Sequence, residues 1–141
     1  MKKWSGRVRV TSKPEETRSI AAEFARNLPA GTVLSLVGDL GTGKTEFVKG
    51  LAIGLGFVGD VTSPTFTILH EYQGGRLALF HMDFYRLQDE RELDEIGLEE
   101  YLRAGGVCAI EWGDKFQQRL PVGTVTVGLI TVEGDQREIG W

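Results

Sequence analysis

The stretch that decides the fold of this chain is Gly38-Asp39-Leu40-Gly41-Thr42-Gly43-Lys44-Thr45. It fills every fixed position of the phosphate-loop pattern G-x-x-x-x-G-K-[ST]. In that pattern the glycines let successive backbone N–H groups converge on phosphates, while the lysine reaches the terminal phosphates and the last hydroxyl is a magnesium ligand. We therefore expect these eight residues to hold a nucleotide together with Mg²⁺, with Lys44 on the phosphates and Thr45 on the metal.

The sequence on either side of the loop supports this interpretation. Residues 32–37 (Thr-Val-Leu-Ser-Leu-Val) form a mostly apolar run of strand length, and Phe47, Leu51 and Leu55 recur at helical spacing after the loop. The order strand, loop, helix separates a working phosphate loop from a chance match, and the helix start adds its positive dipole end. A plain glycine turn with a solvated lysine is therefore disfavoured.

Further patterns extend the fold on both sides of this unit. Alternation in residues 7–11 predicts a half-buried strand, and Ser12 with Glu15 forms an S-x-x-E capping box that predicts a helix start. The other predicted elements are a hairpin of residues 66–72 and 76–82, a charged helix at about 89–102, a buried strand at 106–110 and a hairpin of 124–132 and 136–141. Because parallel elements mix with antiparallel hairpins, we predict a three-layer α/β fold with a mixed sheet, in a single domain spanning residues 1–141.

Length and composition limit the class of protein. At 141 residues the chain has the size of one domain, and its net charge of −4 argues against a protein that mainly grips a nucleic-acid backbone. The apolar runs are too short to cross a bilayer, and the first residues lack the apolar stretch of a secretory signal. The single cysteine, Cys108, has apolar neighbours and fits a buried structural thiol in a reducing compartment. We expect a cytoplasmic protein without membrane association.

Two acidic residues stand at the ends of predicted strands. Glu111 closes the buried run 107–110, and Asp83 follows residues 77–82. Open α/β sheets present ligand-binding groups beyond their strand ends, and nucleotide hydrolysis needs a carboxylate near the magnesium ion. Either acid alone could be a solvated strand end, but we expect at least one to act. The predicted catalytic residues are thus Glu111, Asp83 and Lys44, with Thr45 and Glu111 at the metal.

Two other features carry a weaker signal. Residues 62–66 (Thr-Ser-Pro-Thr-Phe) follow the phosphate-loop helix, where many nucleotide switches carry a loop that senses the terminal phosphate, although a turn of this composition is mostly only a turn. His81 and His70 lack the spaced Cys or His partners of a zinc site, and His81, near Asp83, is the more interesting of the two. The turn at Thr11 and Ser12, together with Arg137, is our candidate for the adenine and ribose contacts.

Four segments together resemble one known family. Residues 38–45, 63–66 (Ser-Pro-Thr-Phe), 81–87 (His-Met-Asp-Phe-Tyr-Arg-Leu) and 110–112 (Ile-Glu-Trp) are similar to the motifs of the bacterial TsaE ATPases, which take part in making the threonylcarbamoyladenosine modification of transfer RNA. The phosphate loop is shared by many families, whereas the other three segments in this order are specific. The resemblance runs from the helix start at Ser12 to the closing hairpin and is weakest after Gly134.

The resemblance implies site residues and cofactors. Lys44 and Thr45 would bind ATP and Mg²⁺, and Glu111 would complete the magnesium site. Asp83 would belong to a switch-like segment, Trp112 would pack beside the nucleotide, and Thr65 would lie in the first switch loop. The cofactors implied are therefore ATP and Mg²⁺.

The resemblance also implies a partner. By this resemblance, the protein would assist a separate transferase, built from two related subunits, which forms the threonylcarbamoyl group on adenosine 37 of transfer RNA, and an ATP-driven step would reset that complex between turnovers. Transfer RNA would be met indirectly, through the complex. Once the phosphate-loop core is assigned, little chain is left for a second substrate-binding domain, so the output is expected to pass through a partner.

Three other functions are compatible with a phosphate loop. A small-molecule kinase would need a lid and an acceptor pocket from residues 60–105. A nucleotide-sensing adaptor would bind ATP and barely hydrolyse it. A GTPase is disfavoured because the chain has no N-K-x-D segment after the loop to read guanine.

Overall fold

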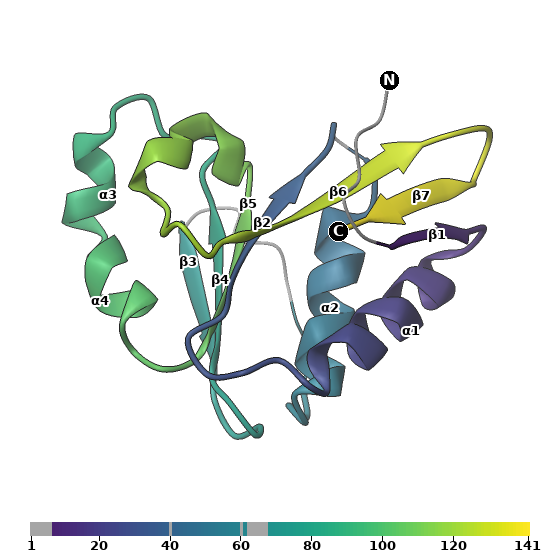
Figure 1. Cartoon of the computed structure of the whole chain (residues 1–141), viewed down its shortest axis with the longest axis horizontal. Coiled ribbons are helices and arrows are strands. Elements are labelled where there is room, and N and C mark those ends of the chain that lie inside the picture. The colour runs from purple at the N-terminus through teal and green to yellow at the C-terminus, as the bar shows by residue number, and fades with distance from the viewer. Residues whose placement is uncertain (1–6, 40, 60, 62–67) are drawn as a thin grey trace.

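One mixed sheet organises the molecule. In the computed structural model, which describes residues 7–39, 41–59, 61 and 68–141, seven strands form a sheet in the order β1-β7-β6-β2-β5-β4-β3 (Figure 1). The strands are β1 (Val8–Thr11), β2 (Val33–Val37), β3 (Leu69–Tyr72), β4 (Leu79–Asp83), β5 (Val107–Glu111), β6 (Val125–Thr131) and β7 (Arg137–Gly140). The helices are α1 (Pro14–Ala25), α2 (Lys44–Gly54), α3 (Arg91–Glu95), α4 (Leu98–Leu102) and the 3₁₀ segment η1 (Gly113–Arg119). No helix in the described part of the chain is long and apolar enough to cross a membrane.

The centre of the sheet is parallel and its edges are antiparallel. Strand β2 pairs parallel with β5 on one side and β6 on the other, and β5 pairs parallel with β4. The outer pairs β3–β4, β6–β7 and β7–β1 are antiparallel. The carboxyl ends of β2, β4 and β5 therefore meet at one edge of the sheet, where residue 38, Asp83 and Glu111 lie.

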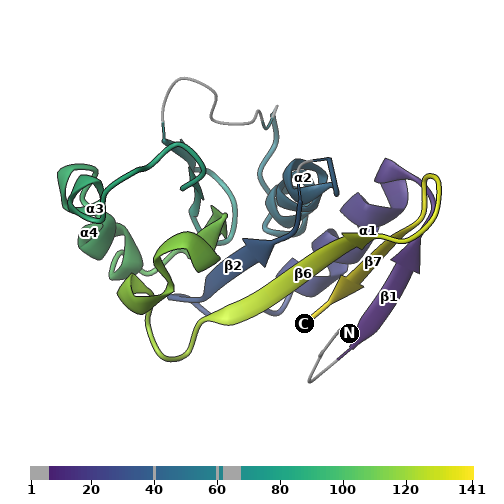
Figure 2. The ribbon, with the colours of Figure 1, turned by 90° about the horizontal axis from the view of Figure 1, so that it is seen from above.

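Helices cover both faces of the sheet, which confirms the predicted three-layer α/β fold. On β5, Val107 and Ala109 belong to the core that α1 and α2 close, while Cys108 and Ile110 belong to the core that α3, α4 and η1 close. A strand buried on both faces reads as a continuous apolar run, which is how this segment reads in the sequence. Helices α3 and α4 lie at the β3–β5 end of the sheet, away from β1 and β7 (Figures 1 and 2).

The first helical layer depends on glycines in α2. A Cβ added at Gly50 would lie 2.2 Å from the carbonyl oxygen of Arg18, and one added at Gly54 would lie 2.3 Å from that of Ala22. Helix α1 thus packs its backbone directly on α2. The phosphate loop leads into α2, so this contact fixes the helix on which the loop is mounted.

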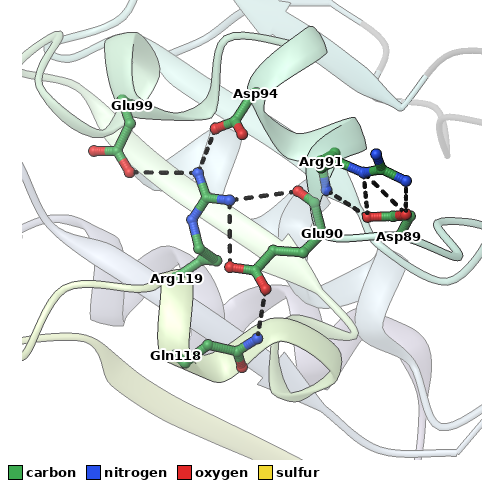
Figure 3. A network of polar contacts seen from close by, with 7 residues as sticks. All are labelled: Asp89, Glu90, Arg91, Asp94, Glu99, Gln118 and Arg119. Atoms are coloured by element: carbon green, nitrogen blue, oxygen red, sulfur yellow. Dashed lines mark hydrogen bonds and ion pairs between the residues drawn. The ribbon is translucent and has the colours of Figure 1, made fainter.

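Charged contacts tie the second helical layer to the segment after β5. Arg119 at the end of η1 is 18% exposed at its side chain and reaches Asp94 Oδ1 at 2.6 Å, Glu90 Oε1 at 3.5 Å and Glu99 Oε1 at 3.8 Å (Figure 3). Gln118 donates to the Glu90 carboxylate at 3.4 Å. Isolated surface ion pairs contribute little, but one guanidinium shared by three carboxylates is a network with a defined geometry. It holds η1, and so the chain just beyond Glu111, against α3 and α4.

Two local predictions are wrong. The helix predicted at residues 89–102 is two short helices, because Gly97 adopts a left-handed conformation (φ 78°) that ends α3 and precedes α4. The capping box assigned to Ser12 and Glu15 is absent: Lys13 is the N-cap of α1, and the Ser12 N–H donates a hydrogen bond to the Glu16 carboxylate at 2.6 Å. The helix start is one residue later than predicted, so the acid that reaches back is also one residue later.

Two other predictions concern burial. Cys108 is buried, its thiol donates to the Tyr101 carbonyl oxygen at 3.4 Å, and burial raises the pKa of the thiol to about 12. The predicted burial of this thiol is confirmed. Strand β1 is less buried than predicted, since Val8 and Val10 are exposed and only Thr11 is buried.

The close approach of α1 and α2 makes Gly50 sensitive to any side chain. Gly50→Ala should destabilise the protein by about 1–3 kcal/mol, because the added methyl group displaces the backbone of α1. This loss should exceed the gain of up to about 1 kcal/mol that alanine brings within a helix. Gly123→Ala is the matched control, because a Cβ there would meet nothing within 4 Å. Denaturant unfolding would measure both, and equal midpoints for the two variants would contradict the packing argument.

Candidate phosphate and magnesium site

The phosphate loop has a backbone shape that needs glycine. Gly41 (φ 80°) and Gly43 (φ 101°) are left-handed, and Gly43 is the N-cap of α2. A Cβ at Gly38 would lie 2.4 Å from the Leu129 carbonyl oxygen, so this glycine is needed for close approach to β6. Leu40, also predicted as part of the loop, lies outside the described residues, as does the predicted switch segment 62–66 with Thr65.

Lys44 lies folded over its own loop. The residue is only 5% exposed, and its Nζ donates to the carbonyl oxygens of Gly38 at 2.5 Å and Asp39 at 2.8 Å. Burial lowers the pKa of the ammonium, and the negative charges of Glu111 and Asp83 oppose that shift. Among the described residues, no carboxylate lies within 4.0 Å of Nζ. The lysine is thus a desolvated cation with which an incoming anion can form an ion pair.

Two carboxylates lie side by side at the ends of neighbouring strands. Asp83 on β4 is the register partner of Glu111 on β5. Burial raises the pKa of Asp83, and the charge of Glu111 adds to that rise, although the Tyr85 N–H donates to Asp83 at 2.9 Å and lowers the pKa in part. Glu111 is 5% exposed, and its Oε2 is 3.5 Å from the Thr45 hydroxyl. Like charges this close favour a bound cation.

Trp112 covers the space between the lysine and the strand ends. Its ring centroid lies 4.6 Å from Lys44 Nζ and 5.0 Å from the ring of Tyr85. Of the non-glycine residues described, Trp112 alone has a positive φ (59°), and its backbone N–H donates to the Leu36 carbonyl oxygen at 3.1 Å. This hydrogen bond to β2 holds the turn that directs the indole over the loop.

These side chains share one cavity of about 330 Å³. It is lined by the predicted site residues Gly41, Gly43, Lys44, Thr45, Asp83, Glu111 and Trp112, together with Glu46 and Tyr85. The structure therefore brings together groups from the loop, β4 and β5 that the sequence separates. Sequence reasoning missed Glu46 and Tyr85 as lining residues. Glu46 directly follows Thr45, and Tyr85 lies two residues after Asp83. This closeness to predicted site residues was the sequence feature that could have identified them.

A second cavity, of about 370 Å³, lies on the other side of the loop. Gly41, Gly43 and Glu46 line both cavities, so the loop separates them. Arg137 reaches the second cavity from β7, with its Nη2 3.3 Å from the Gly41 carbonyl oxygen, and Ser12 and Thr42 also line it. Thr11, the other half of the predicted turn, is instead buried against Thr17 at 3.0 Å.

The donor set fits a magnesium ion that is bound together with phosphates. Within the described ranges, no group of three or more His, Cys, Asp or Glu residues is placed to hold a metal by itself. The oxygens of Thr45, Asp83 and Glu111 are hard ligands of the kind Mg²⁺ prefers, and Mg²⁺ is usually held by one or two carboxylates plus substrate phosphates.

Comparison with known proteins gives the family. A family model described as "Threonylcarbamoyl adenosine biosynthesis protein TsaE" matches residues 11–139. A tRNA threonylcarbamoyladenosine biosynthesis protein TsaE of Bacillus subtilis is 47% identical over 129 residues, which are 92% of this chain and 80% of the relative. A protein of the same name from Treponema pallidum is 45% identical over 130 residues, 92% of this chain and 96% of the relative.

A solved structure agrees with these sequence matches. The crystal structure of Bacillus subtilis YdiB superposes with a TM-score of 0.80 at 40% identity, covering 99% of this chain and 86% of the other. The match extends across the mixed sheet, the phosphate loop and both helical layers. On the sequence and the fold together, this chain belongs to the TsaE family.

Proposed function

We propose that this protein binds ATP with Mg²⁺ at the phosphate loop and hydrolyses it, in support of a partner transferase that forms the threonylcarbamoyl group on adenosine 37 of transfer RNA. One observation carries the first half of the proposal: a buried lysine without a carboxylate partner among the described residues lies beside two adjacent carboxylates. The lysine is placed to bind an anion, and the two carboxylates are placed to bind a cation. A nucleotide polyphosphate bound with magnesium supplies both.

The phosphates fit the cavity that contains Lys44. Lys44 and Thr45, in the first turn of α2, line the same space, where the N–H groups of a helix start would bind an anion, and Gly41 and Gly43 would add backbone N–H groups without a Cβ in the way. On binding, Lys44 would exchange its bonds to the Gly38 and Asp39 carbonyl oxygens for bonds to the phosphates. That exchange replaces neutral acceptors by charged ones, which form stronger hydrogen bonds.

The nucleoside fits the second cavity, across the loop. Arg137 already approaches the loop at Gly41, and Ser12 and Thr42 supply polar groups beside it. A ligand spanning both cavities would pass over Gly41 and Gly43, which line both. Nucleotide contacts are therefore proposed for the loop residues, Trp112 and Arg137.

Hydrolysis would use the strand-end acids. Thr45 and Glu111 would hold Mg²⁺, which would neutralise charge that develops on the phosphates, and Asp83, the register neighbour of Glu111, would orient water around the ion. Trp112 covers this end of the site and limits access of bulk water to Lys44.

The transfer RNA half of the proposal rests on the family. The named relatives are biosynthesis proteins of tRNA threonylcarbamoyladenosine, and one nucleotide would occupy both of the cavities described. The modification chemistry would then belong to a partner. ATP can drive such a partner only if the bound and hydrolysed states present it with different surfaces.

Lys44→Ala should reduce the affinity for an ATP analogue with Mg²⁺ by at least about tenfold, because the phosphates lose the buried cation in a water-poor site. Calorimetric titration measures the affinity directly. Lys49→Ala is the matched control: Lys49 lies on the same helix, is more exposed, and pairs with Glu46 at 2.9 Å. Unchanged affinity in a folded Lys44→Ala variant would place the nucleotide elsewhere.

Asp83→Asn should slow hydrolysis by about tenfold or more and, at the same time, raise the melting temperature of the ligand-free protein at neutral pH. Because the folded-state pKa of Asp83 is raised, its ionisation costs stability as the pH rises through that pKa, and asparagine removes this cost. The gain over wild type should shrink as the pH falls toward the ordinary aspartate pKa of about 3.9. Thermal unfolding at several pH values and phosphate release measure the two effects. An equally active variant would remove Asp83 from the site, and a variant that is less stable than wild type at pH 7 would contradict the raised pKa of Asp83.

Phosphate release should be slow for the protein alone and should rise at least about tenfold, equivalent to about 1.4 kcal/mol of barrier, when the transferase subunits and transfer RNA are added. Multiple-turnover modification of transfer RNA, measured in the same mixtures, should require this protein. A Lys44→Ala sample is the control for contaminating ATPases. Unchanged phosphate release, with modification proceeding equally well without the protein, would refute the partner role and leave the ATP site standing.

A further inference from the structure

His81 is a buried polar residue that the proposed chemistry does not use. It lies on β4, is 0% exposed, and its Nε2 is 2.5 Å from Oε2 of Glu111 on β5. The register pairs His81 with Ala109 and Asp83 with Glu111, so these side chains leave the sheet on the same face. The histidine therefore lies one strand away from the proposed metal ligand and contacts it directly.

The direction of this hydrogen bond follows from the two partners. An ionised carboxylate can only accept, so Nε2 carries the hydrogen and donates it to Glu111. The other ring nitrogen, Nδ1, is buried and has no hydrogen-bond partner in the described part of the chain. A buried nitrogen without a hydrogen-bond partner lowers the stability of the folded protein. Such groups are retained in proteins where the residue has a function.

The function of His81 follows from the position of Glu111 relative to Lys44. Lys44 and Glu111 are both buried and line the same cavity, and Glu111 is the strongest of the charges that act on the lysine. Even so, no ion pair within 4.0 Å joins them in the described structure. A direct pair would cancel the charges that the phosphates and the metal need. The bond from His81 ties the Glu111 carboxylate to a side chain of the neighbouring strand β4.

We infer that His81 is a positioning residue that fixes the Glu111 carboxylate for magnesium and keeps it from pairing with Lys44. This inference rests on the proposed function of the site and assigns it a new member. Ligating carboxylates are commonly held by a further hydrogen bond, and loss of such a partner typically costs about 10–100-fold in metal affinity or activity.

The test compares three substitutions of His81. His81→Leu removes the donor, His81→Asn keeps a polar group whose amide is too short to reach Glu111, and His81→Gln places an amide N–H near the position of Nε2. His70→Gln is the control, because His70 lies opposite His81 on β3 and contacts Tyr72 instead. The measured quantity is the factor by which Mg²⁺ increases the affinity for a non-hydrolysable ATP analogue.

His81→Leu and His81→Asn should each lower that factor by about tenfold or more, while His81→Gln and His70→Gln stay within about threefold of wild type. In a Glu111→Gln background, His81→Leu should cause no further loss, since its effect passes through Glu111. A purely structural role would give equal losses in both backgrounds. Either that result or a wild-type factor in both His81→Leu and His81→Asn overturns the inference.

A measurement on the ligand-free protein separates this inference from the ATP proposal. Nitrogen-15 NMR of the imidazoles should show His81 protonated at Nε2, with a proton protected from exchange that shifts in Glu111→Gln. His81 without a proton at Nε2, or a proton unaffected by Glu111→Gln, overturns the inference whatever the protein binds. Failure of the ATP proposal is recognised separately, by wild-type affinity in Lys44→Ala.

Discussion

The parallel alignment of β2, β4 and β5 is the constraint on which the site depends. The three strands end at the same side of the sheet. The loop after β2, Asp83 at the end of β4 and Glu111 at the end of β5 therefore lie close together. Parallel strands of this kind must be buried on both faces, and here two separate hydrophobic cores provide that burial. The chemistry at the strand ends is therefore supported by apolar packing on both sides of the sheet.

The charged residues of the site lower the stability of the ligand-free protein. The lysine in it is desolvated, and among the described residues its hydrogen bonds go to carbonyl oxygens; an aspartate has a raised pKa beside a second carboxylate. Groups whose environments disfavour their charges mark functional sites, because a ligand of opposite charge relieves the cost. The packing of α1 on Gly50 and Gly54, and the network around Arg119, stabilise the two helical layers on which these groups are mounted.

The sequence predicted what depends on local pattern. The loop motif, the buried strand before Glu111 and the two hairpins were readable because periodicity and turn residues determine them. The capping residue of α1 and the break at Gly97 were not, since a one-residue change in where a helix starts, or one glycine within a helical pattern, is settled by packing. The cavity that joins Lys44 to Asp83 could be expected from strand ends alone, whereas the bond between His81 and Glu111 could not. It joins residues 30 positions apart and requires the exact register of β4 on β5.

Charge separation is the property that unites the site residues. Lys44 is retained by its own loop and by the ring of Trp112, and Glu111 is retained by His81, so neither satisfies the other. Under the proposed function, an anion that draws Lys44 away from the loop carbonyl oxygens would also change its contact with Trp112, whose ring packs on Tyr85 just beyond β4. Tyr85 is exposed, and its carbonyl oxygen accepts a bond from Lys115 in η1 at 2.8 Å. The loop lysine is thus connected through the rings of Trp112 and Tyr85 to the molecular surface, which is where the proposed partner would meet a difference between the ligand-bound and the empty protein.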